Sequence, residues 1–454
     1  MDVLFEALLA NRAAVASTTA AQRSAKLQRL ADSLLRHRGP IRNALAADHR
    51  RHPAEVDLTE IYPVLSEIKH ARKNLTRWMK PQRVATPLAL AGARSWVQWQ
   101  PKGAALILSP WNFPVNLTLG PLVSAVAAGN TVLLKPSEHT PHASEVIQSI
   151  VRDVFDGDEV ALVQGDADVA RECLRLPFQH IFFTGAPAVG KAVMRAAADH
   201  LASVTLELGG KSPTIVDPSA DLVTAARRIA WAKWMNNGQV CIAPDHVWVH
   251  ESRHDELVAL LGAQVRKLFG KEPKSSPSYS RLINARQFER VAGYLQGTEV
   301  EMDPAERYIQ PTILAGVSLD HPAMSEEIFG PVLPVLRYRN LDEPLNHINA
   351  GDKPLALYLF SGDPATIDRV LRETRAGGTC INHSGLQFSN PNLPFGGDNV
   401  SGLGKSHGIY GFQEFSNARA VMRQYGRFSP VELMMPPFGS RWKQALIDLT
   451  LRWF

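Results

Sequence analysis

The segment HIFFTGAPAVGKAVM, residues 180–194, joins an apolar run to a glycine turn and then to a helix-forming run. The residues before Gly185 are typical of a buried strand, and Val193 and Met194 begin a helical pattern. A loop that opens a helix can hold phosphate with backbone N–H groups and the helix dipole. The segment therefore predicts a strand–loop–helix unit that binds phosphate, with a plain strand-to-helix turn as the alternative.

The spacing of Gly185, Gly190 and Lys191 nearly matches the phosphate loop of nucleotide triphosphatases. That loop requires Ser or Thr after the lysine to hold magnesium, and here the position is Ala192. Without the hydroxyl, a metal-free dinucleotide pyrophosphate is the better ligand. A nucleotide triphosphatase stays an alternative, which failure to bind Mg-ATP would exclude.

The same pattern of a short apolar run followed by a helical stretch repeats on both sides of this segment. Strands alternating with helices predict a parallel, doubly wound sheet. A second alternating region predicts another α/β domain that begins near residue 208, whereas residues 1–80 are predicted to be helical. The predicted strands lie in the runs 103–110, 130–137, 180–185, 212–217, 245–250, 331–338, 355–361 and 377–382.

Composition limits the class of protein. The 454 residues exceed one small core, and 45% apolar with 20% charged residues is ordinary for a soluble globular protein. The net charge of +5 includes no basic run interleaved with aromatics, so nucleic-acid binding is not expected. The three cysteines are widely separated and lack a CxxC pattern, which predicts a reducing compartment and no metal site. No signal peptide is recognisable and no apolar run reaches the length of about 18 residues that a membrane span needs. We expect a cytoplasmic protein.

The C-terminal segment RWKQALIDLTLRWF, residues 441–454, predicts an amphipathic helix. Trp442, Leu446, Leu449 and Trp453 fall on one helical face. We interpret it as a helix docked on its own protein or on a subunit partner. A peripheral membrane anchor is the alternative.

Two polar side chains stand in positions suited to covalent chemistry. Cys241 lies in MNNGQVCIAPDH, residues 235–246, among Asn, Gly and Gln and not in an apolar run where a structural thiol usually lies. Glu207 of LELGGKSP lies at an apolar strand end, where a raised pKa would suit a general base. A salt-bridged edge acid is the alternative for Glu207.

Two further motifs lie at predicted strand ends. Asn112 of SPWNFP, between two prolines, is placed to donate a hydrogen bond to an oxyanion, or else it stabilises the turn. Lys135 and Glu138 of LLKPSE could bind phosphate and ribose hydroxyls, or form a solvated turn.

Taken in order, these motifs resemble the aldehyde dehydrogenase superfamily from about residue 95 to 425. LELGGKSP followed by NNGQVCIAP is similar to the family's paired signature, and PWNFP, LLKPSE, FFTGAPAVGK, EEIFGPVLPV and LPFGGDNVSGLGKSHG keep the family's order. AKWMNNGQVCIAPDH, RYIQPTIL and KPLALYLFS are most similar to the class 3 branch, which includes fatty and aromatic aldehyde dehydrogenases.

The resemblance implies an aldehyde dehydrogenase-like α/β fold with a doubly wound, Rossmann-like cofactor domain, a second α/β catalytic domain and a small β arm for oligomerisation. The implied boundaries are 1–80 and 101–207 for the dinucleotide-binding domain, 208–411 for the catalytic domain, 81–100 and 412–430 for the arm, and 431–454 for the amphipathic tail.

The resemblance also implies how the site works. Cys241 would attack the aldehyde, Asn112 and the backbone N–H of Cys241 would hold the oxyanion, and Glu207 would activate the water that hydrolyses the thioester. The polar surround should spare Cys241 the raised pKa that apolar burial gives a thiol. Glu207 is generally missing from relatives that pass the acyl group to coenzyme A, so it favours release of a free acid.

The implied cofactor is NAD, with NADP accepted. The implied cofactor-binding residues are Leu108, Ser109, Trp111, Lys135, Glu138, Gly165, Thr184, Gly185, Ala186, Val189, Leu208, Gly209, Glu327 and Phe329. Ala186 departs from the family's usual Ser or Gly, which removes one hydrogen bond to the pyrophosphate.

The implied substrate is a medium- to long-chain aliphatic or an aromatic aldehyde, and the implied assembly is a homodimer. Asp398 stands where the family often has a small or apolar residue, which bears on the substrate entrance, and Cys173 and Cys380 match no catalytic position. The alternative function is a catalytically silent binding protein of the same fold, which the retained set of Cys241, Glu207 and Asn112 disfavours.

Overall fold

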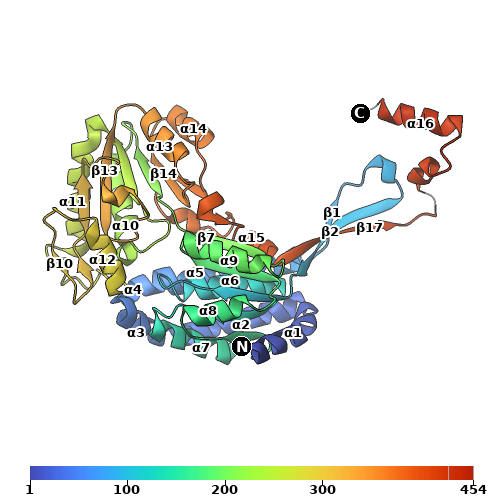
Figure 1. The fold of residues 1–454 in the computed structure, drawn as a ribbon, viewed down its shortest axis with the longest axis horizontal. Coiled ribbons are helices and arrows are strands. Elements are labelled where there is room, and N and C mark those ends of the chain that lie inside the picture. Colours follow the sequence, from blue (N-terminus) through green and yellow to red (C-terminus); the bar gives the residue numbers. More distant parts are fainter. Residues whose placement is uncertain (428, 453–454) are drawn as a thin grey trace.

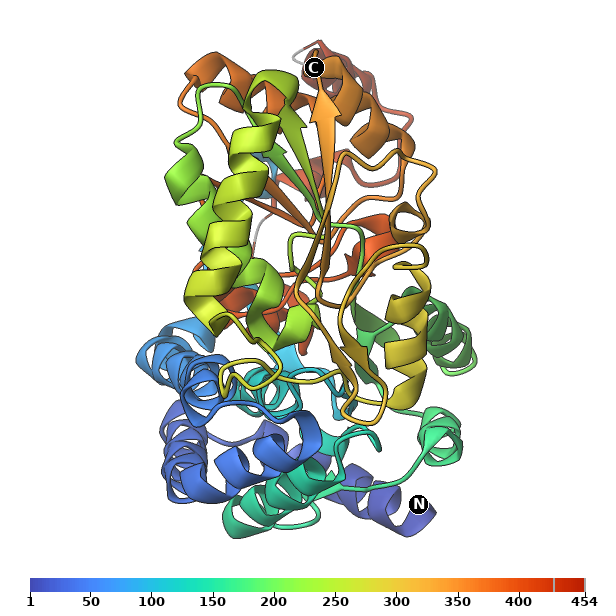
Figure 2. The same cartoon turned by 90° about the vertical axis from the view of Figure 1, so that its left-hand side faces the viewer.

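The computed structural model describes residues 1–427 and 429–452 and contains two six-stranded sheets with a thin arm. Figure 2 shows the N-terminal unit below and the second unit above it, and Figure 1 shows the arm extending to one side. Trp453, predicted to lie on the face of the terminal helix, is outside the described residues.

The N-terminal region is helical, as its apolar spacing predicted. The second helix shows why: Thr19 and Gln22 form a capping box at its start, and Leu27, Leu30 and Leu34 are fully buried on one face. The helices are α1 (Asp2–Ala16), α2 (Ala20–Arg36), α3 (Arg38–His49), α4 (Pro53–Val56) and α5 (Tyr62–Trp78).

The first sheet has the strand order β16-β7-β6-β3-β4-β5, and only β16 is antiparallel. The chain begins at β3, winds outward to β5, and then returns to β6 on the other side of β3. The order therefore reverses between β3 and β6, which is where open α/β sheets bind ligands. The strands are β3 (Ala104–Leu108), β4 (Thr131–Lys135), β5 (Val160–Leu162), β6 (His180–Gly185), β7 (Ser203–Leu208) and β16 (Gly402–Leu403), with helices α6 (Asn116–Ala128), α7 (Pro141–Val154), α8 (Ala167–Leu174) and α9 (Pro187–Ala198) between them.

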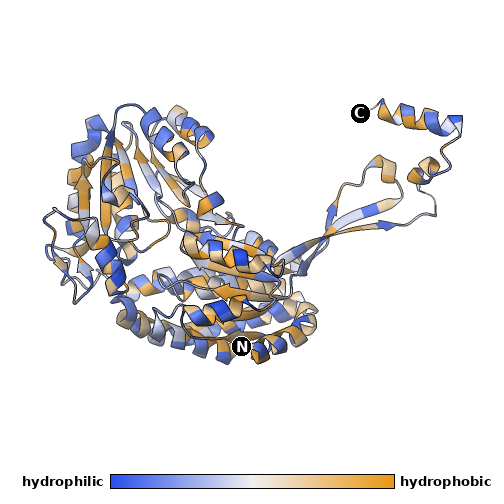
Figure 3. Ribbon diagram, in the orientation of Figure 1, coloured by the Kyte–Doolittle hydropathy of each residue, from blue (hydrophilic) through white to orange (hydrophobic). Residues whose placement is uncertain are grey.

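The second sheet is parallel throughout, in the order β12-β13-β9-β8-β14-β15. Its strands are β8 (Pro213–Val216), β9 (His246–His250), β12 (Thr312–Ala315), β13 (Val332–Tyr338), β14 (Ala356–Phe360) and β15 (Gly378–Ile381). Its helices are α10 (Leu222–Trp234), α11 (His254–Phe269), α12 (Ala285–Gly293), α13 (Asp342–Ala350) and α14 (Pro364–Glu373), and a short hairpin joins β10 (Met302–Asp303) to β11 (Tyr308–Ile309). Figure 3 shows that the strands of both sheets are mainly apolar and that the helices around them carry both polar and apolar residues. The strand orders and their parallel directions confirm the predicted doubly wound architecture.

The chain returns to the first sheet before residue 411, the predicted end of the second domain. β16 pairs with β7 of the first sheet, and the following helix α15 (Gly408–Glu414) bonds to the N-terminal unit. The Gly408 N–H donates to Glu67 of α5 at 2.7 Å, and Thr205 of β7 donates to Glu414 at 2.9 Å. A two-residue strand has no periodic signal in the sequence, so this return could not be predicted from pattern.

The arm is a three-stranded antiparallel sheet of β1 (Gln82–Val84), β2 (Ala93–Pro101) and β17 (Ser416–Gln424). Beyond it lies α16 (Arg441–Leu451), far from the two sheets in Figure 1 and with none of its residues buried. Trp442 is 55% exposed and Leu451 67% exposed. Within the described chain, each helix is too short or too polar to cross a membrane.

A buried ion pair connects the helical layer to the loops above the first sheet. Arg51 and Glu60 are both fully buried, with Nη1 and Oε1 2.6 Å apart. The other guanidinium nitrogen donates to the backbone oxygen of Asn112 at 2.5 Å and to Oδ1 of Asn236 at 2.8 Å. One side chain therefore fixes the SPWNFP turn and the loop that precedes Cys241.

Replacing Arg51 should therefore destabilise the protein strongly. In Arg51→Met, Glu60 becomes a buried carboxyl without its cation, and such losses cost about 3–5 kcal/mol. The matched variant Arg36→Met removes an exposed pair with Asp153 and should cost far less. Urea unfolding followed by circular dichroism measures both, and equal losses would contradict the assignment of Arg51.

Candidate active site

Two cavities meet inside the molecule. One, of about 190 Å³, is mostly apolar and lies between α5, α6 and the 385–407 region. The other, of about 840 Å³, lies at the carboxyl ends of β6 and β7 and reaches the second domain. Four residues line both cavities: Thr184, Glu207, Leu208 and Cys241.

The loop before Cys241 has an unusual backbone. Asn236 and Asn237 have φ angles of 47° and 57°, in the left-handed region that asparagine tolerates better than most residues. Gly238 has a φ of 76°, and a Cβ there would lie 2.2 Å from the backbone oxygen of Gly330. Neighbouring groups hold this turn, since the Asn236 N–H donates to Glu55 at 2.6 Å.

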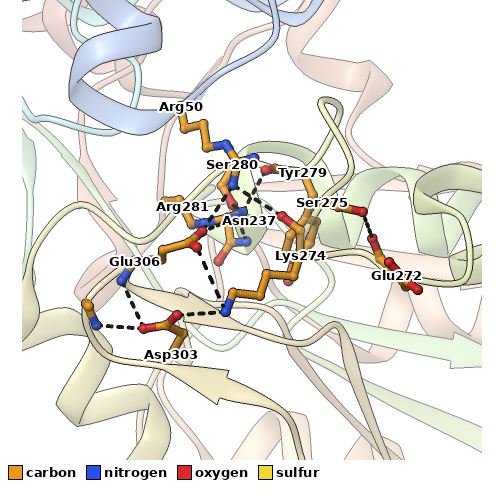
Figure 4. Close-up of polar contacts among 11 residues, drawn as sticks. Arg50, Asn237, Glu272, Lys274, Ser275, Tyr279, Ser280, Arg281, Asp303 and Glu306 are labelled. Carbon is orange, nitrogen blue, oxygen red and sulfur yellow. Dashed lines mark hydrogen bonds and ion pairs between the residues drawn. The ribbon is translucent and has the colours of Figure 1, made fainter.

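A polar network supports the loop from the second domain (Figure 4). The Asn237 amide donates to the Ser280 oxygen at 3.0 Å. The Gln239 amide donates to the Arg281 oxygen at 3.0 Å. Arg281 is itself paired with Glu306 at 2.8 Å. The loop is thus fixed by Arg51 on one side and by the segment around Arg281 on the other.

The expected polar surround of Cys241 does not keep its pKa low. Burial raises the pKa of the Cys241 thiol, and the carboxylates of Glu327 and Glu207 raise it further. Its side chain packs against the core of the second domain. The sequence shows the polar neighbours, but in the fold those neighbours bond to other groups and leave the sulfur in apolar contact. The thiol is protonated at neutral pH in this state.

Glu207 ends β7 and is 6% exposed. Its Oε1 accepts a hydrogen bond from the Ser406 hydroxyl at 2.7 Å, whereas its Oε2 has no partner among the described residues. Burial raises the pKa of Glu207 to about 8, and the nearby charge of Lys405 opposes this shift. The raised pKa agrees with the sequence prediction, and no described residue forms the alternative salt bridge.

Asn112 lies against the cysteine loop. Its Nδ2 donates to the Gln239 backbone oxygen at 3.1 Å, and the residue is 3% exposed. An amide nitrogen carries two hydrogens, so one N–H can serve a ligand. Beside it the rings of Trp111 and Phe329 meet edge to face, 5.3 Å apart, at the wall of the second cavity.

The residues predicted to hold a cofactor divide into two groups. Those that line the second cavity are Trp111, Thr184, Gly185, Ala186, Leu208, Gly209, Glu327 and Phe329. Those that do not line it are Leu108 and Ser109 at the end of β3, Lys135 at the end of β4, Glu138 after β4, Gly165 after β5, and Val189 in α9. The second group stands at the carboxyl-end side of the first sheet, so both groups flank the reversal point between β3 and β6.

The second cavity and the adjoining carboxyl ends of β3, β4 and β6 together fit a dinucleotide. The hydroxyls of Ser109 and Thr184, at the ends of β3 and β6, are buried and without a partner among the described residues. A Cβ at position 209 would lie 2.0 Å from Oε2 of Glu327. Because Gly209 has no side chain, the Glu327 carboxylate can stay at the cavity wall. Lys135 and Glu138 form an ion pair of 2.9 Å that offers both charges to a ribose or phosphate.

Residue patterns alone did not identify two groups of the site. Lys211 donates from Nζ to Asp245 at 2.6 Å and to the Glu326 oxygen at 2.8 Å. Lys211 directly follows the strand-end glycines of LELGGKSP, and this position is the feature of the sequence that could have indicated its place in the site. Ser406 contacts Glu207 across 199 positions of sequence, and no local pattern could indicate that contact.

The fold combines a doubly wound cofactor sheet with a second α/β domain, and a thiol and a carboxyl lie at the junction of two cavities. These features define an oxidoreductase that brings a dinucleotide and a small substrate together. The family model for aldehyde dehydrogenases matches residues 3–421, and the chain belongs to that family. It is an NAD(P)-dependent aldehyde dehydrogenase.

Its relatives cover nearly the whole chain. The 4,4'-diaponeurosporen-aldehyde dehydrogenase of Staphylococcus aureus is 39% identical over 93% of both chains. Aldehyde dehydrogenase family 3 member B1 of Homo sapiens is 40% identical over 94% of this chain and 92% of its own. A probable coniferyl aldehyde dehydrogenase of Pseudomonas aeruginosa is 40% identical over 100% and 96%. The solved structure of a substrate-bound Staphylococcus aureus AldH superposes with a TM-score of 0.94, 37% identity and 99% coverage of both chains.

A methyl group at Gly209 should weaken cofactor binding. In Gly209→Ala the new Cβ displaces the Glu327 carboxylate, and overpacking of this kind costs enough to weaken binding about tenfold. In the neighbouring Gly210→Ala the Cβ meets backbone atoms only at 3.4 Å, so its effect should be smaller. Calorimetric titration with NAD compares the two variants, and equal affinities would contradict the role of Glu327.

Proposed function

We propose that the protein oxidises a medium- to long-chain aliphatic or an aromatic aldehyde to its carboxylic acid, through covalent intermediates on Cys241. The observation that carries this is the shared wall: Cys241 and Glu207 line both the apolar cavity and the polar cavity. An aldehyde in the first and a dinucleotide in the second would meet at one sulfur. Relatives named for 4,4'-diaponeurosporen-aldehyde and coniferyl aldehyde support a substrate larger than acetaldehyde.

The first half of the reaction forms the covalent bond. The Cys241 thiol gives up its proton to solvent, and Sγ bonds to the carbonyl carbon. The carbonyl oxygen becomes an oxyanion, held by the free N–H of the Asn112 amide and the backbone N–H of Cys241. NAD or NADP, when bound, supplies the acceptor for the hydride that leaves this carbon, and a thioester remains on Cys241.

The second half releases the acid. Glu207, in its ionised form, takes a proton from water, and the water oxygen bonds to the thioester carbon while the carbon–sulfur bond breaks. Cys241 leaves as the thiolate and is protonated again. The balance is one aldehyde, one oxidised dinucleotide and one water giving one acid, one reduced dinucleotide and one proton. Because the pKa of Glu207 is raised to about 8, hydrolysis should become faster as the pH rises through this value.

NAD is the proposed cofactor, with NADP accepted. The Glu138 carboxylate, 36% exposed, suits the ribose hydroxyls of NAD. The Lys135 ammonium, 2.9 Å from it, offsets that negative charge and so reduces repulsion of a 2′-phosphate. We propose a cytoplasmic location, which the three free cysteines support.

The proposed assembly is a homodimer that uses the arm. Among the described strands, β17 pairs along one edge only, and its side chains are mostly exposed, with Met422 56% exposed. The apolar residues of α16 would be covered by the partner subunit. Contact with a membrane surface is the alternative for this helix, which its Arg441 and Lys443 favour.

Glu207→Gln should separate the two halves of the reaction. The amide cannot take a proton from water, so hydrolysis should slow by about 10²-fold or more while one turnover of reduced cofactor still forms. Rapid mixing with an aromatic aldehyde and NAD, followed by absorbance of the reduced nicotinamide and mass spectrometry of the acyl-enzyme, measures both steps. Cys241→Ala is the control that should give neither. An unchanged steady state in Glu207→Gln would remove Glu207 from the reaction.

Removing residues 437–454 tests the tail. The full chain should have about twice its mass of 49.9 kDa by light scattering, and the shortened chain should dissociate at higher concentration because α16 no longer packs on the partner. Sedimentation with anionic vesicles decides the alternative. If only the full chain binds vesicles, and both chains dimerise equally well, α16 is a membrane contact and not a subunit contact.

A further inference from the structure

The Ser406 hydroxyl is buried beside Glu207 and faces two acceptors. Ser406 is 8% exposed and lines the apolar cavity. Its Oγ lies 2.7 Å from Oε1 of Glu207 and 3.2 Å from the backbone oxygen of Phe395. A hydroxyl has one proton to donate, so Ser406 can serve only one of these acceptors at a time.

The backbone around Ser406 is held on both sides. Ser406 and Phe395 exchange both backbone hydrogen bonds, at 2.6 and 3.1 Å. The Lys405 ammonium donates to the oxygens of Gly396 and Gly397 at 2.7 and 2.8 Å. Two residues after Ser406, the Gly408 N–H donates to Glu67 at 2.7 Å. The hydroxyl can therefore rotate, but its Oγ stays beside Glu207.

The other charged or titratable groups facing Glu207 act without a hydrogen bond. Lys405, on the segment that carries Ser406, lowers the pKa of Glu207, and Glu414 of α15 raises it. Across the cavity, the negative charge of Glu207 raises the pKa of the Cys241 thiol. Of the described residues, Ser406 alone donates a hydrogen bond to the Glu207 carboxylate, and Oε2 is left without a partner.

We propose that Ser406 is a positioning residue for thioester hydrolysis, which holds Oε1 of Glu207 and leaves Oε2 for the attacking water. The proposal rests on the proposed function, in which Glu207 is the base. The hydroxyl donates to Glu207 while the carboxylate is ionised. When Glu207 takes the proton from water, Ser406 turns its own proton to the Phe395 oxygen. No bond to Ser406 forms or breaks in this cycle.

Ser406→Ala should shift the pH dependence of hydrolysis. Loss of a hydrogen bond to the charged form raises the pKa of Glu207, so the midpoint of the rate profile should move upward by about one pH unit. At pH 7 this lowers the ionised fraction, and hence the hydrolysis rate, about tenfold. The first turnover of reduced cofactor should keep its rate, because Cys241 and Asn112 are untouched. Single-turnover and steady-state rates with NAD and an aromatic aldehyde, from pH 6 to 10, measure these effects.

Two variants distinguish positioning from mere packing. Ser406→Thr keeps a hydroxyl, so the midpoint of its pH profile for hydrolysis should stay where it is in the unaltered protein. Ser401→Ala removes another buried serine hydroxyl of the same segment, which bonds to the Asp398 oxygen at 3.1 Å, and should lower the melting temperature without moving the midpoint. If Ser406→Ala does not fold, Ser406→Cys, of similar size and a weaker donor, should show the same shift.

The outcomes separate this proposal from the proposed function. If Glu207→Gln blocks hydrolysis but Ser406→Ala leaves both the rate and the midpoint unchanged, the role of Ser406 is overturned and Glu207 remains the base. If Glu207→Gln hydrolyses normally, the base is elsewhere and both proposals are overturned. A shifted midpoint in Ser406→Ala, restored in Ser406→Thr, supports the role of Ser406.

Discussion

The buried guanidinium of Arg51 is the constraint on which the site depends, because it bonds to groups that the chain brings from three directions. It pairs with Glu60, which in turn accepts the backbone N–H groups of Val115 and Asn116 at 3.1 and 2.8 Å. It also holds the Asn112 oxygen and the Asn236 side chain. The planar, multi-donor form of arginine suits this task, since one rigid group can satisfy several buried acceptors at fixed angles. The turn with Asn112 and the loop before Cys241 consequently keep one relative position, although they belong to different domains.

Burial dominates the electrostatics of the site. Burial raises the pKa of the Cys241 thiol, and it raises the pKa of the Glu207 and Glu327 carboxyls to about 8. In the proposed reaction these shifts are complementary. A protonated thiol is protected from oxidation until a substrate is present, and a carboxyl with a pKa near 8 can both accept and return a proton near neutral pH. A lower pKa for Cys241 would make it a better resting nucleophile but also an easier target for oxidants.

The local chemistry of the sequence predicts most of the scaffold. The strands and the loop at Gly185 follow from apolar runs that end in glycine or proline, and these signals do not depend on distant residues. The environment of Cys241 was predicted wrongly, because Asn236 and Gln239 are polar in the sequence but donate their side-chain hydrogen bonds to the backbone of other loops, at Asn112 and Arg281. The return of β16 to the first sheet escaped prediction because a strand of two residues carries no pattern. Contacts such as that of Ser406 with Glu207 depend on the completed fold, and only the three-dimensional structure can supply them.

The junction of the two cavities explains why the glycines beside Glu207 matter as much as the charged groups. A thiol that must reach an aldehyde on one side and a dinucleotide on the other needs a thin wall between the two spaces. Leu208 forms part of that wall, and a Cβ at Gly190 would lie 2.8 Å from its side chain. A larger residue at Gly190 would push Leu208 toward the cavities, and one at Gly209 would push Glu327 away. The absence of side chains at these two positions lets the apolar and polar cavities approach within the reach of a single sulfur.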